Sequence, residues 1–232
     1  MYTPNKLELS NSKNPYGRLF INTLNDITQE LEDYYCNETV IAIGASTGGI
    51  KAIETILEKL PDNMPPIVIV QHLPKRHTDS LARRLDIISA LHVSEAKHND
   101  QLLSGHVYIA PGDQHMTIKK IKGKLHIQLD DGPLVCYQKP SVEVLFNSMA
   151  AVVKDKGFGI ILTGMGSDGA NGLKNMKDCG AHTVAQDEAT SIVFGMPRRA
   201  IELGAAPITL PIHNISRNIV DKLRDNRLGL AQ

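Results

Sequence analysis

The sequence predicts an α/β protein with a single doubly wound, mostly parallel sheet, helices on both faces and an inserted antiparallel β-hairpin. Three observations predict this fold. From Thr39 onward, short β-branched runs alternate with helical patterns, which is typical of parallel strands joined by crossover helices. The chain has 232 residues, 42% of them hydrophobic, which is enough to bury a full core. No linker-like stretch divides residues 39–232, so we expect one domain there.

The expected elements justify this fold in chain order. The first half contains strands at 40–43, 66–71, 91–95 and 106–110, with helices beginning near Thr47 and Thr78. The segments "HMTIKK" and "KLHIQL", joined by a turn at Gly123, predict the hairpin. The second half contains strands at 157–162, 181–186 and 207–212, with helices opened by "KPSVEVLF", ending near Cys179, within "GMPRRAIELG" and over 214–227. Pro140 and Ser141 are favourable residues for starting the helix at "KPSVEVLF".

Composition excludes several classes of protein. Lys plus Arg and Asp plus Glu number 25 each, so no basic field is present to bind nucleic acid. The three cysteines have no metal-ligand spacing and form no complete disulfide framework, which favours a reducing cytoplasm. No signal peptide and no apolar run of membrane-spanning length is apparent. Residues 1–38 are polar and only weakly helical, and we interpret them as an N-terminal arm or linker remnant.

A glycine-rich turn follows the first expected strand. Open parallel sheets bind their ligands at the carboxyl ends of the strands, and here that position carries Gly44-Ala-Ser46-Thr-Gly48, a match to G-x-S-x-G. Glycines permit a sharp strand-to-helix turn that raises the serine oxygen above the sheet, next to the N–H groups of the following helix. The spacing alone leaves two interpretations open, because Ser46 is either an exposed nucleophile or part of a turn that holds a phosphate.

Two further strand ends carry side chains that suit a serine nucleophile. His72 ends the second strand, next in order to the strand that bears Ser46, and is the best-placed base among the nine histidines. Asp168 follows the strand at 157–162, and its carboxylate is expected to accept the Nδ1–H of His72. Backbone N–H groups beside Ser46 and in the turn around Met165 are expected to bind the oxyanion. The alternative for Met165 is an apolar plug over the sheet end.

The turn "GMGSDG" at 164–169 also fits a dinucleotide-binding fingerprint. It lies between a strand and a helix, and Asp187 follows the next strand, where an acid would bind a ribose hydroxyl. A nucleotide-binding oxidoreductase is therefore an alternative. Against it, Asp168 would place a carboxylate against the pyrophosphate, and like charges in contact are unfavourable.

Seven motifs together resemble a known family. In order along residues 39 to about 212 they are "IAIGASTGG", "VIVQHLP", "VYIAPGDQHM", "DGP", "PSVEVLF", "ILTGMGSDGA" and "QDEATSIVFGMPRRAI". They resemble the catalytic domain of the CheB chemotaxis protein-glutamate methylesterases. The resemblance implies hydrolysis of γ-glutamyl methyl esters on chemoreceptor signalling helices, which releases methanol, and deamidation of receptor glutamines. It implies no metal or organic cofactor, and the lack of a long apolar run separately predicts no membrane insertion.

The resemblance also implies roles for individual residues. Its triad order maps onto Ser46, His72 and Asp168, the main-chain N–H of the oxyanion hole falls on Met165, and Thr47 is expected to help hold the histidine. Family members usually carry an N-terminal receiver domain of about 120 residues. Only 38 residues precede the first strand here, so no receiver domain is expected in this chain. A relative that binds receptors without catalysis is a further alternative.

Overall fold

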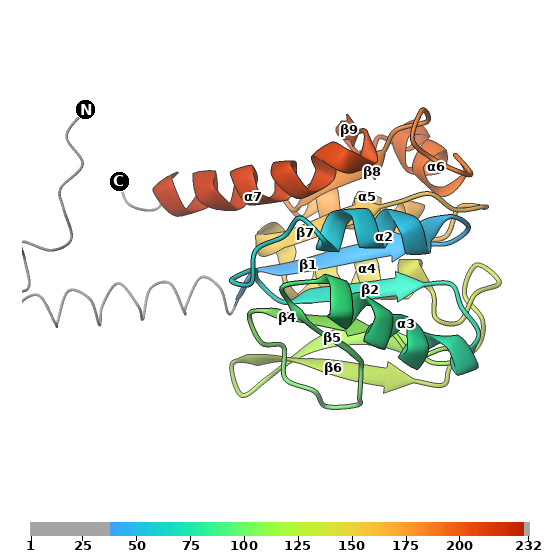
Figure 1. The fold of residues 1–232 in the computed structure, drawn as a ribbon, viewed down its shortest axis with the longest axis vertical. Coiled ribbons are helices and arrows are strands. Elements are labelled where there is room, and N and C mark those ends of the chain that lie inside the picture. Colours follow the sequence, from blue (N-terminus) through green and yellow to red (C-terminus); the bar gives the residue numbers. More distant parts are fainter. Residues whose placement is uncertain (1–37, 230–232) are drawn as a thin grey trace, which may run out of the picture. The chain divides into compact units, whose positions relative to one another are not determined.

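The computed structural model describes residues 38–229, and a seven-stranded parallel sheet lies at its centre. The strand order is β3-β4-β2-β1-β7-β8-β9, and every neighbouring pair is parallel (Figure 1). The sheet strands are β1 (Val40–Ala45), β2 (Ile67–Gln71), β3 (His92–Glu95), β4 (His106–Ile109), β7 (Gly157–Ile161), β8 (His182–Gln186) and β9 (Ile208–Leu210). The doubly wound fold expected from the alternation of strand and helix patterns is confirmed.

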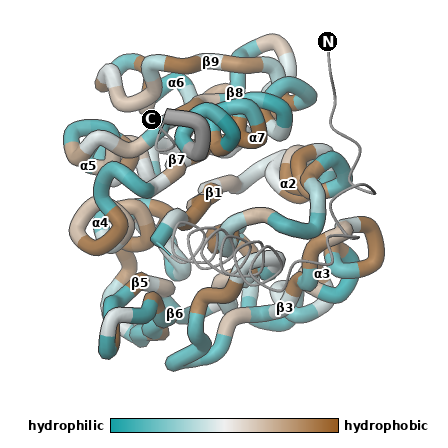
Figure 2. The backbone as a smooth tube through the Cα atoms, turned by 90° about the vertical axis from the view of Figure 1, so that its left-hand side faces the viewer, coloured by the Kyte–Doolittle hydropathy of each residue, from teal (hydrophilic) through white to brown (hydrophobic). Residues whose placement is uncertain are grey.

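Helices cover both faces of the sheet. They are α2 (Gly49–Leu57), α3 (Lys75–Ile88), α4 (Val142–Val152), α5 (Ala170–Asp178), α6 (Met196–Glu202) and α7 (Ile212–Gly229), with a short 3₁₀ helix η2 (Lys154–Lys156). Figure 2 shows α2 and α3 on one side of β1, and α4 and α5 on the other. The crossover connections therefore place two helical layers around one sheet, as parallel strand pairing requires.

Alternate residues of the strands face the two helical layers. In β1, Ile41 and Ile43 belong to the core that packs against α2, α3 and α7, whereas Val40 and Ala42 belong to the core on the side of α4, α5 and α6. All four side chains are completely buried. This pattern explains why β1 is a continuous apolar run, because a parallel strand covered on both faces has no polar side.

The expected hairpin is also present. Strands β5 (His115–Ile121) and β6 (Lys124–Asp130) pair antiparallel around Gly123 and form a separate two-stranded sheet. Their apolar residues Met116, Ile118 and Ile127 join the core on the side of α4. The hairpin thus extends this core beyond the main sheet.

The starts of α2, α3 and α7 differ from the sequence-based expectation, and α7 begins at Ile212, two residues earlier than expected. Helix α2 begins at Gly49 instead of near Thr47, because Ser46 and Thr47 form the turn that leaves β1. Helix α3 begins at Lys75, three residues earlier than expected. Pro74 takes the extended N-cap conformation there, and the charged residues after it continue as helix.

The N-terminal arm expected at 1–38 lies outside the described residues, apart from its last residue. Among the helices that the structure describes, none is both long enough and apolar enough to cross a membrane.

Candidate active site

Ser46 lies where β1 passes into α2. Its backbone N–H donates to the carbonyl of Thr163 (3.0 Å), which ties this turn to the residues that follow β7. Gly48, the N-cap residue of α2, has φ +81°, a left-handed conformation that favours glycine. Gly164 lies against Ser46, because a Cβ added to this glycine would meet Ser46 Cβ at 2.7 Å. The two glycine-rich turns are therefore neighbours at one edge of the sheet.

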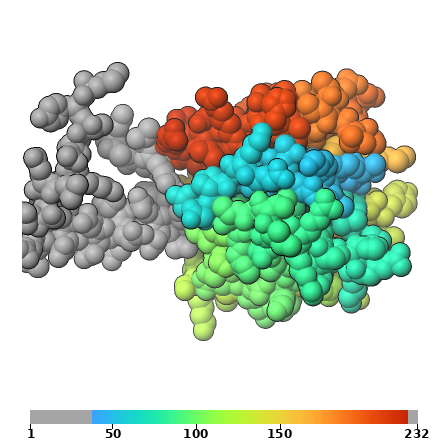
Figure 3. Space-filling model, viewed as in Figure 1, coloured from blue at the N-terminus to red at the C-terminus, as the bar shows by residue number. Residues whose placement is uncertain are grey.

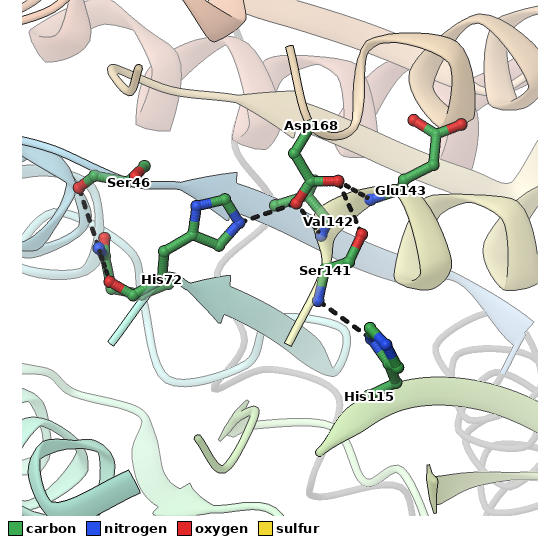
Figure 4. A network of polar contacts seen from close by, with 8 residues as sticks. Ser46, His72, His115, Ser141, Val142, Glu143 and Asp168 are labelled. Carbon is green, nitrogen blue, oxygen red and sulfur yellow. Dashed lines mark hydrogen bonds and ion pairs between the residues drawn. The ribbon is translucent and has the colours of Figure 1, made fainter. Parts of the chain in front are cut away.

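His72 follows β2 at the same edge. Its backbone N–H donates to the carbonyl of Ala45 (3.1 Å), which places His72 beside the residue that precedes Ser46. Its side chain is 8% exposed, and Nε2 lies 2.8 Å from Asp168 Oδ2 (Figure 4). The structure thus brings together the histidine and the carboxylate that were predicted from separate strand ends.

Asp168 belongs to the turn between β7 and α5, and its side chain contacts the N-terminus of α4. Oδ1 accepts hydrogen bonds from Ser141 Oγ (2.7 Å) and the Glu143 N–H (3.0 Å), while Oδ2 accepts from the Val142 N–H (2.7 Å) and His72 (Figure 4). Ser141 occupies the N-cap position, but its hydroxyl makes no capping bond to the helix it precedes. The carboxylate of Asp168 satisfies these helix N–H groups in its place.

The environment of Asp168 favours its ionised form. Burial raises the pKa of this carboxyl, but hydrogen bonds from His72, Ser141 and the backbone of Glu143 and Val142 outweigh burial and hold the pKa below its usual value. An ionised carboxylate only accepts hydrogen bonds, so the contacting Nε2 of His72 carries a proton. In neutral His72 the lone pair therefore lies on Nδ1, which makes Nδ1 the basic nitrogen of the site.

The expected contact between Asp168 and Nδ1 of His72 is wrong, because the contacting atom is Nε2. The strand order explains the difference. Asp168 follows β7, which lies two strands from β2, and neighbouring strands are about 4.8 Å apart. Only Nε2, the ring nitrogen farther from the backbone, reaches across this span. Nδ1, the nitrogen nearer the backbone, makes no hydrogen bond with Asp168.

Ser46 and His72 are not hydrogen-bonded in this structure. Nδ1 of His72 is buried and has no hydrogen-bond partner among the residues described. Figure 4 shows the ring between Ser46 on one side and Asp168 on the other. Nδ1 is thus an open acceptor next to the turn of Ser46, and hydrogen bonds of catalytic groups are often incomplete before substrate binds.

The two residues expected to support the reaction differ in how they are placed. Within the described residues, the backbone N–H of Met165 has no acceptor, and this residue follows the Gly164 that packs on Ser46. The Met165 side chain is 76% exposed, so it does not plug the sheet end. The side chain of Thr47 is exposed, and its carbonyl accepts a bond from Thr163 Oγ1 (2.9 Å). Support of His72 by the Thr47 side chain stays a prediction.

Sequence reasoning missed two residues of this network. Gln71 is the last residue of β2, and its side-chain Nε2 donates to the carbonyls of Ser46 (2.9 Å) and His72 (3.3 Å), which joins the two turns. Ser141 was expected only to start a helix, but its hydroxyl binds Asp168 and its N–H donates to His115 Nδ1 (3.2 Å; Figure 4). The only sequence signal for Gln71 is its place as a polar residue at the end of an apolar strand. No sequence signal points to the contact between Ser141 and Asp168.

The low pKa of Asp168 predicts a loss of stability in acid. Because the folded pKa lies below the unfolded value of about 3.9, the ionised group stabilises the fold above that pH. This contribution is lost as the pH falls from about 4 through the folded pKa. Denaturant unfolding at pH 7, 5, 4 and 3 should show a steeper loss below pH 4 for wild type than for Asp168→Asn. Equal slopes for the two proteins would contradict this assignment.

Gly44→Ala should destabilise the protein through Val142. A Cβ at Gly44 would meet Val142 Cγ1 at 2.2 Å, and Val142 also supplies a backbone N–H to Asp168. We expect the free energy of unfolding to fall by about 1–3 kcal/mol. In the double variant Gly44→Ala/Val142→Ala, the removed methyl groups make room, so the combined loss should be smaller than the sum of the single losses. Additive losses would show that the overlap is not the cause.

The fold and the site together define a class of protein. A serine, a histidine and a buried carboxylate converge at the carboxyl edge of a parallel sheet, with backbone N–H groups beside the serine. These are the groups used by hydrolases with a serine nucleophile. Their order along the chain, Ser then His then Asp, differs from that of the α/β-hydrolases, although the G-x-S-x-G spacing is shared.

Comparison with known proteins places the chain in a particular family. The family model described as CheB methylesterase matches residues 41–219. A protein-glutamate methylesterase/protein-glutamine glutaminase of Shewanella denitrificans is 53% identical over 183 residues, 79% of this chain and 52% of its own length. A relative of the same description from Saccharophagus degradans is 51% identical over 179 residues, 77% of this chain and 51% of its own length.

A solved structure agrees with these relatives. The crystal structure of the Thermotoga maritima CheB methylesterase catalytic domain matches with a TM-score of 0.77 and 41% identity, over 79% of this chain and 97% of that domain. The chain belongs to the CheB methylesterase family. It spans about half the length of the curated relatives it matches.

Proposed function

We propose that this chain is a protein-glutamate methylesterase that hydrolyses the γ-methyl esters of glutamyl side chains on chemoreceptors, giving glutamate and methanol. The observation that carries the proposal is the 2.8 Å contact between His72 Nε2 and Asp168 at the sheet edge that bears Ser46. This contact leaves Nδ1 as a base directed toward a serine. Membership of the CheB methylesterase family supports the choice of substrate.

In the proposed reaction, Nδ1 of His72 removes the proton of Ser46 Oγ as this oxygen attacks the ester carbonyl. The C–O bond to methanol then breaks, and the proton held on Nδ1 leaves with methanol. Water attacks the acyl-enzyme with its proton taken by Nδ1, and the bond to Ser46 breaks as the serine regains a proton. One ester and one water thus give one carboxylic acid and one methanol. Asp168 stays ionised and stabilises the imidazolium that forms in each step.

The oxyanion of the tetrahedral intermediates is assigned to backbone donors. The Met165 N–H is the first candidate, because it has no acceptor among the described residues and adjoins the glycine that contacts Ser46. A fixed N–H stabilises the charge where it develops and costs no rearrangement during the reaction. Thr47 is the proposed support at the other side of the turn.

The same groups suit deamidation of glutamine side chains. Ammonia would replace methanol as the leaving group and would also depart with the proton from His72. The names of the relatives include protein-glutamine glutaminase, which supports this second activity. The proposed protein partners are the signalling helices of methylated chemoreceptors. The free thiols Cys136 and Cys179 support a reducing compartment, the cytoplasm.

A dinucleotide-binding function has less support. The carboxylate of Asp168 in the "GMGSDG" turn is buried and accepts four hydrogen bonds, which leaves a negative charge where a pyrophosphate would lie. The Asp187 carboxylate accepts hydrogen bonds from Thr190 in its own turn, so its Oδ1 is already engaged and does not await a ribose hydroxyl.

The test is methanol release from methylated chemoreceptor membranes by the wild type and by Ser46→Ala. Methanol from the wild type alone supports the proposal, and equal rates contradict the role of Ser46. Binding of receptor membranes without methanol release would identify a relative without catalytic activity. Micromolar binding of NAD(P) that survives Ser46→Ala would favour the oxidoreductase.

Ser141→Ala should change the pH dependence of the reaction. The Ser141 hydroxyl donates to Asp168 at 2.7 Å and is one of the groups that lower the pKa of this carboxyl, so its removal raises the pKa of Asp168. The acid limb of kcat/KM should then shift to higher pH, with kcat lowered about 10-fold, as expected for the loss of one hydrogen bond to a charged group. Ser141→Thr keeps a hydroxyl and should restore the wild-type profile. A Ser141→Ala profile that is lower but not displaced would mean that Ser141 acts on stability alone.

A further inference from the structure

A cavity of about 450 Å³ lies beside the candidate nucleophile. Ser46 and His72 form one end of its lining, and the rest comes from α2, α3 and the end of β2. Figure 3 shows the molecular face on which the surfaces of α2 (blue to cyan) and α3 (green) lie next to each other. A substrate whose scissile bond reached Ser46 would extend other groups into this space.

The walls of the cavity differ along its length. Ile50 of α2 and Leu73 after β2 are apolar and half-buried. Lys51 of α2 and Arg84 of α3 bring positive charge, and their side chains are 77% and 65% exposed. The lining therefore combines an apolar region with a positively charged region.

A buried carboxylate forms ion pairs with the two cations. The Glu54 side chain is only 4% exposed, and its carboxylate lies 2.6 Å from Arg84 Nη2 and 3.5 Å from Lys51 Nζ. One negative charge thus faces two positive charges, which leaves a net charge of about +1 in the cavity lining, since Glu54 is its one acidic residue. A buried charge is stable only when it is paired, and Arg84 at 2.6 Å is the nearer partner of Glu54.

The two cations keep donors for a ligand. Arginine has five N–H donors and lysine has three, and the contacts with Glu54 use few of them. In the described part of the chain, Arg84 and Lys51 have no ion pair with another carboxylate. Their remaining N–H groups are thus available to a second carboxylate in the cavity. The planar guanidinium of Arg84 presents several donors in one plane, which suits the two oxygens of a carboxylate.

We propose that this cavity is a substrate subsite for an acidic side chain that neighbours the esterified glutamate. The apolar walls at Ile50 and Leu73 suit the aliphatic stem of such a side chain, and Lys51 with Arg84 binds its carboxylate. On a helical substrate, residues three and four positions apart lie side by side, so the acid lies one turn from the ester. The inference rests on the proposed esterase function and adds a preference for substrate charge.

The first experiment compares neighbouring cations on the same helices. Methanol release from methylated receptor membranes is measured for wild type, Lys51→Gln, Arg84→Gln and the double variant. Arg83→Gln is the control, because Arg83 pairs with Asp79 on the surface and does not line the cavity. We expect kcat/KM to fall about 3-fold for each single variant and about 10-fold for the double variant, through KM, while Arg83→Gln stays at the wild-type value.

Folding is controlled separately. Arg84→Gln removes a partner of buried Glu54 and can lower stability, so its unfolding is measured as well. Lys51 is mostly exposed, and Lys51→Gln tests the subsite with an intact fold. Arg84→Lys keeps the charge and should recover most of the lost kcat/KM. Wild-type KM in both Lys51→Gln and the double variant would overturn the subsite.

The second experiment varies the substrate. Helical synthetic peptides with one γ-methyl glutamate carry either Glu or Gln one turn before or after the ester. The wild type should prefer one Glu peptide over its Gln counterpart, and Lys51→Gln/Arg84→Gln should lose this preference. Wild-type hydrolysis without any preference would overturn the subsite and leave the esterase intact. No hydrolysis of peptides or membranes by the wild type would overturn the proposed function itself.

Discussion

Ser46→Ala should lower kcat for methanol release by about 10⁶, which corresponds to roughly 8 kcal/mol of transition-state stabilisation. The variant has no oxygen to form the acyl-enzyme, so the covalent route is closed. The wild-type fold should persist, because the serine is tied to its neighbours through its backbone N–H and carbonyl. Methanol release from methylated receptor membranes, together with thermal unfolding, measures both effects.

The effect of Ser46→Ala should not add to that of His72→Ala. Both residues serve the same proton transfer and bond formation, so the double variant should be about as slow as either single variant. Independent, additive losses would contradict a shared step. A Ser46→Ala protein that retained more than about one hundredth of the wild-type kcat would rule out Ser46 as the nucleophile.

Asp168→Asn should lower kcat by about 10⁴ and also destabilise the fold. The neutral amide of the Asp168→Asn variant cannot stabilise the imidazolium. Its NH₂ group is itself a donor, and it would face N–H and O–H donors that in the wild type bind the Asp168 carboxylate. Two of these donors are the first N–H groups of α4 and a third is the Ser141 hydroxyl. We expect the free energy of unfolding to fall by about 2–3 kcal/mol, because buried donors lose their acceptor. Steady-state rates and denaturant unfolding at pH 7 measure the two losses.

Asp187→Asn is the matched control for this experiment. Asp187 also follows a strand of the sheet, but among the described residues its carboxylate accepts bonds from Thr190 alone, within the same turn. Its rate of methanol release should equal that of the wild type. If Asp187→Asn were as inactive as Asp168→Asn, the loss of activity would come from removing negative charge at this edge of the sheet, and not from losing the contact between Asp168 and His72.

The fold was largely predictable because its strands are buried on both faces. Strands such as β1 and β2 are continuous runs of β-branched and small residues up to their last positions, and the helices between them carry an apolar stripe, so both patterns are local. The start of α3 was placed three residues late, because its first turn is charged and exposed and has no apolar periodicity. Element boundaries depend on capping geometry, which sequence spacing reports poorly.

The candidate site was predictable in its members and less so in its geometry. Ser46, His72 and Asp168 each end or follow a strand, and parallel strands bring their carboxyl ends to one edge. The ring nitrogen that contacts Asp168 was predicted wrongly, because that choice depends on which strands are neighbours. The roles of Gln71 and Ser141 depend on contacts between residues more than twenty positions apart in the chain.

The sequence by itself determined the α/β class, the order of the elements, the resemblance to the family and the three candidate catalytic residues, because these follow from local periodicity and from motifs in a fixed order. The tertiary structure decided what depends on neighbours in space. It set β1 between β2 and β7, directed Nε2 of His72 to Asp168, and placed that carboxylate at the N-terminus of α4. It also brought Arg84 of α3 to Glu54 of α2, which already lies beside Lys51 on the same helix. Glu54 and Arg84 are far apart along the chain, and only the packing of α2 beside α3 creates their contact.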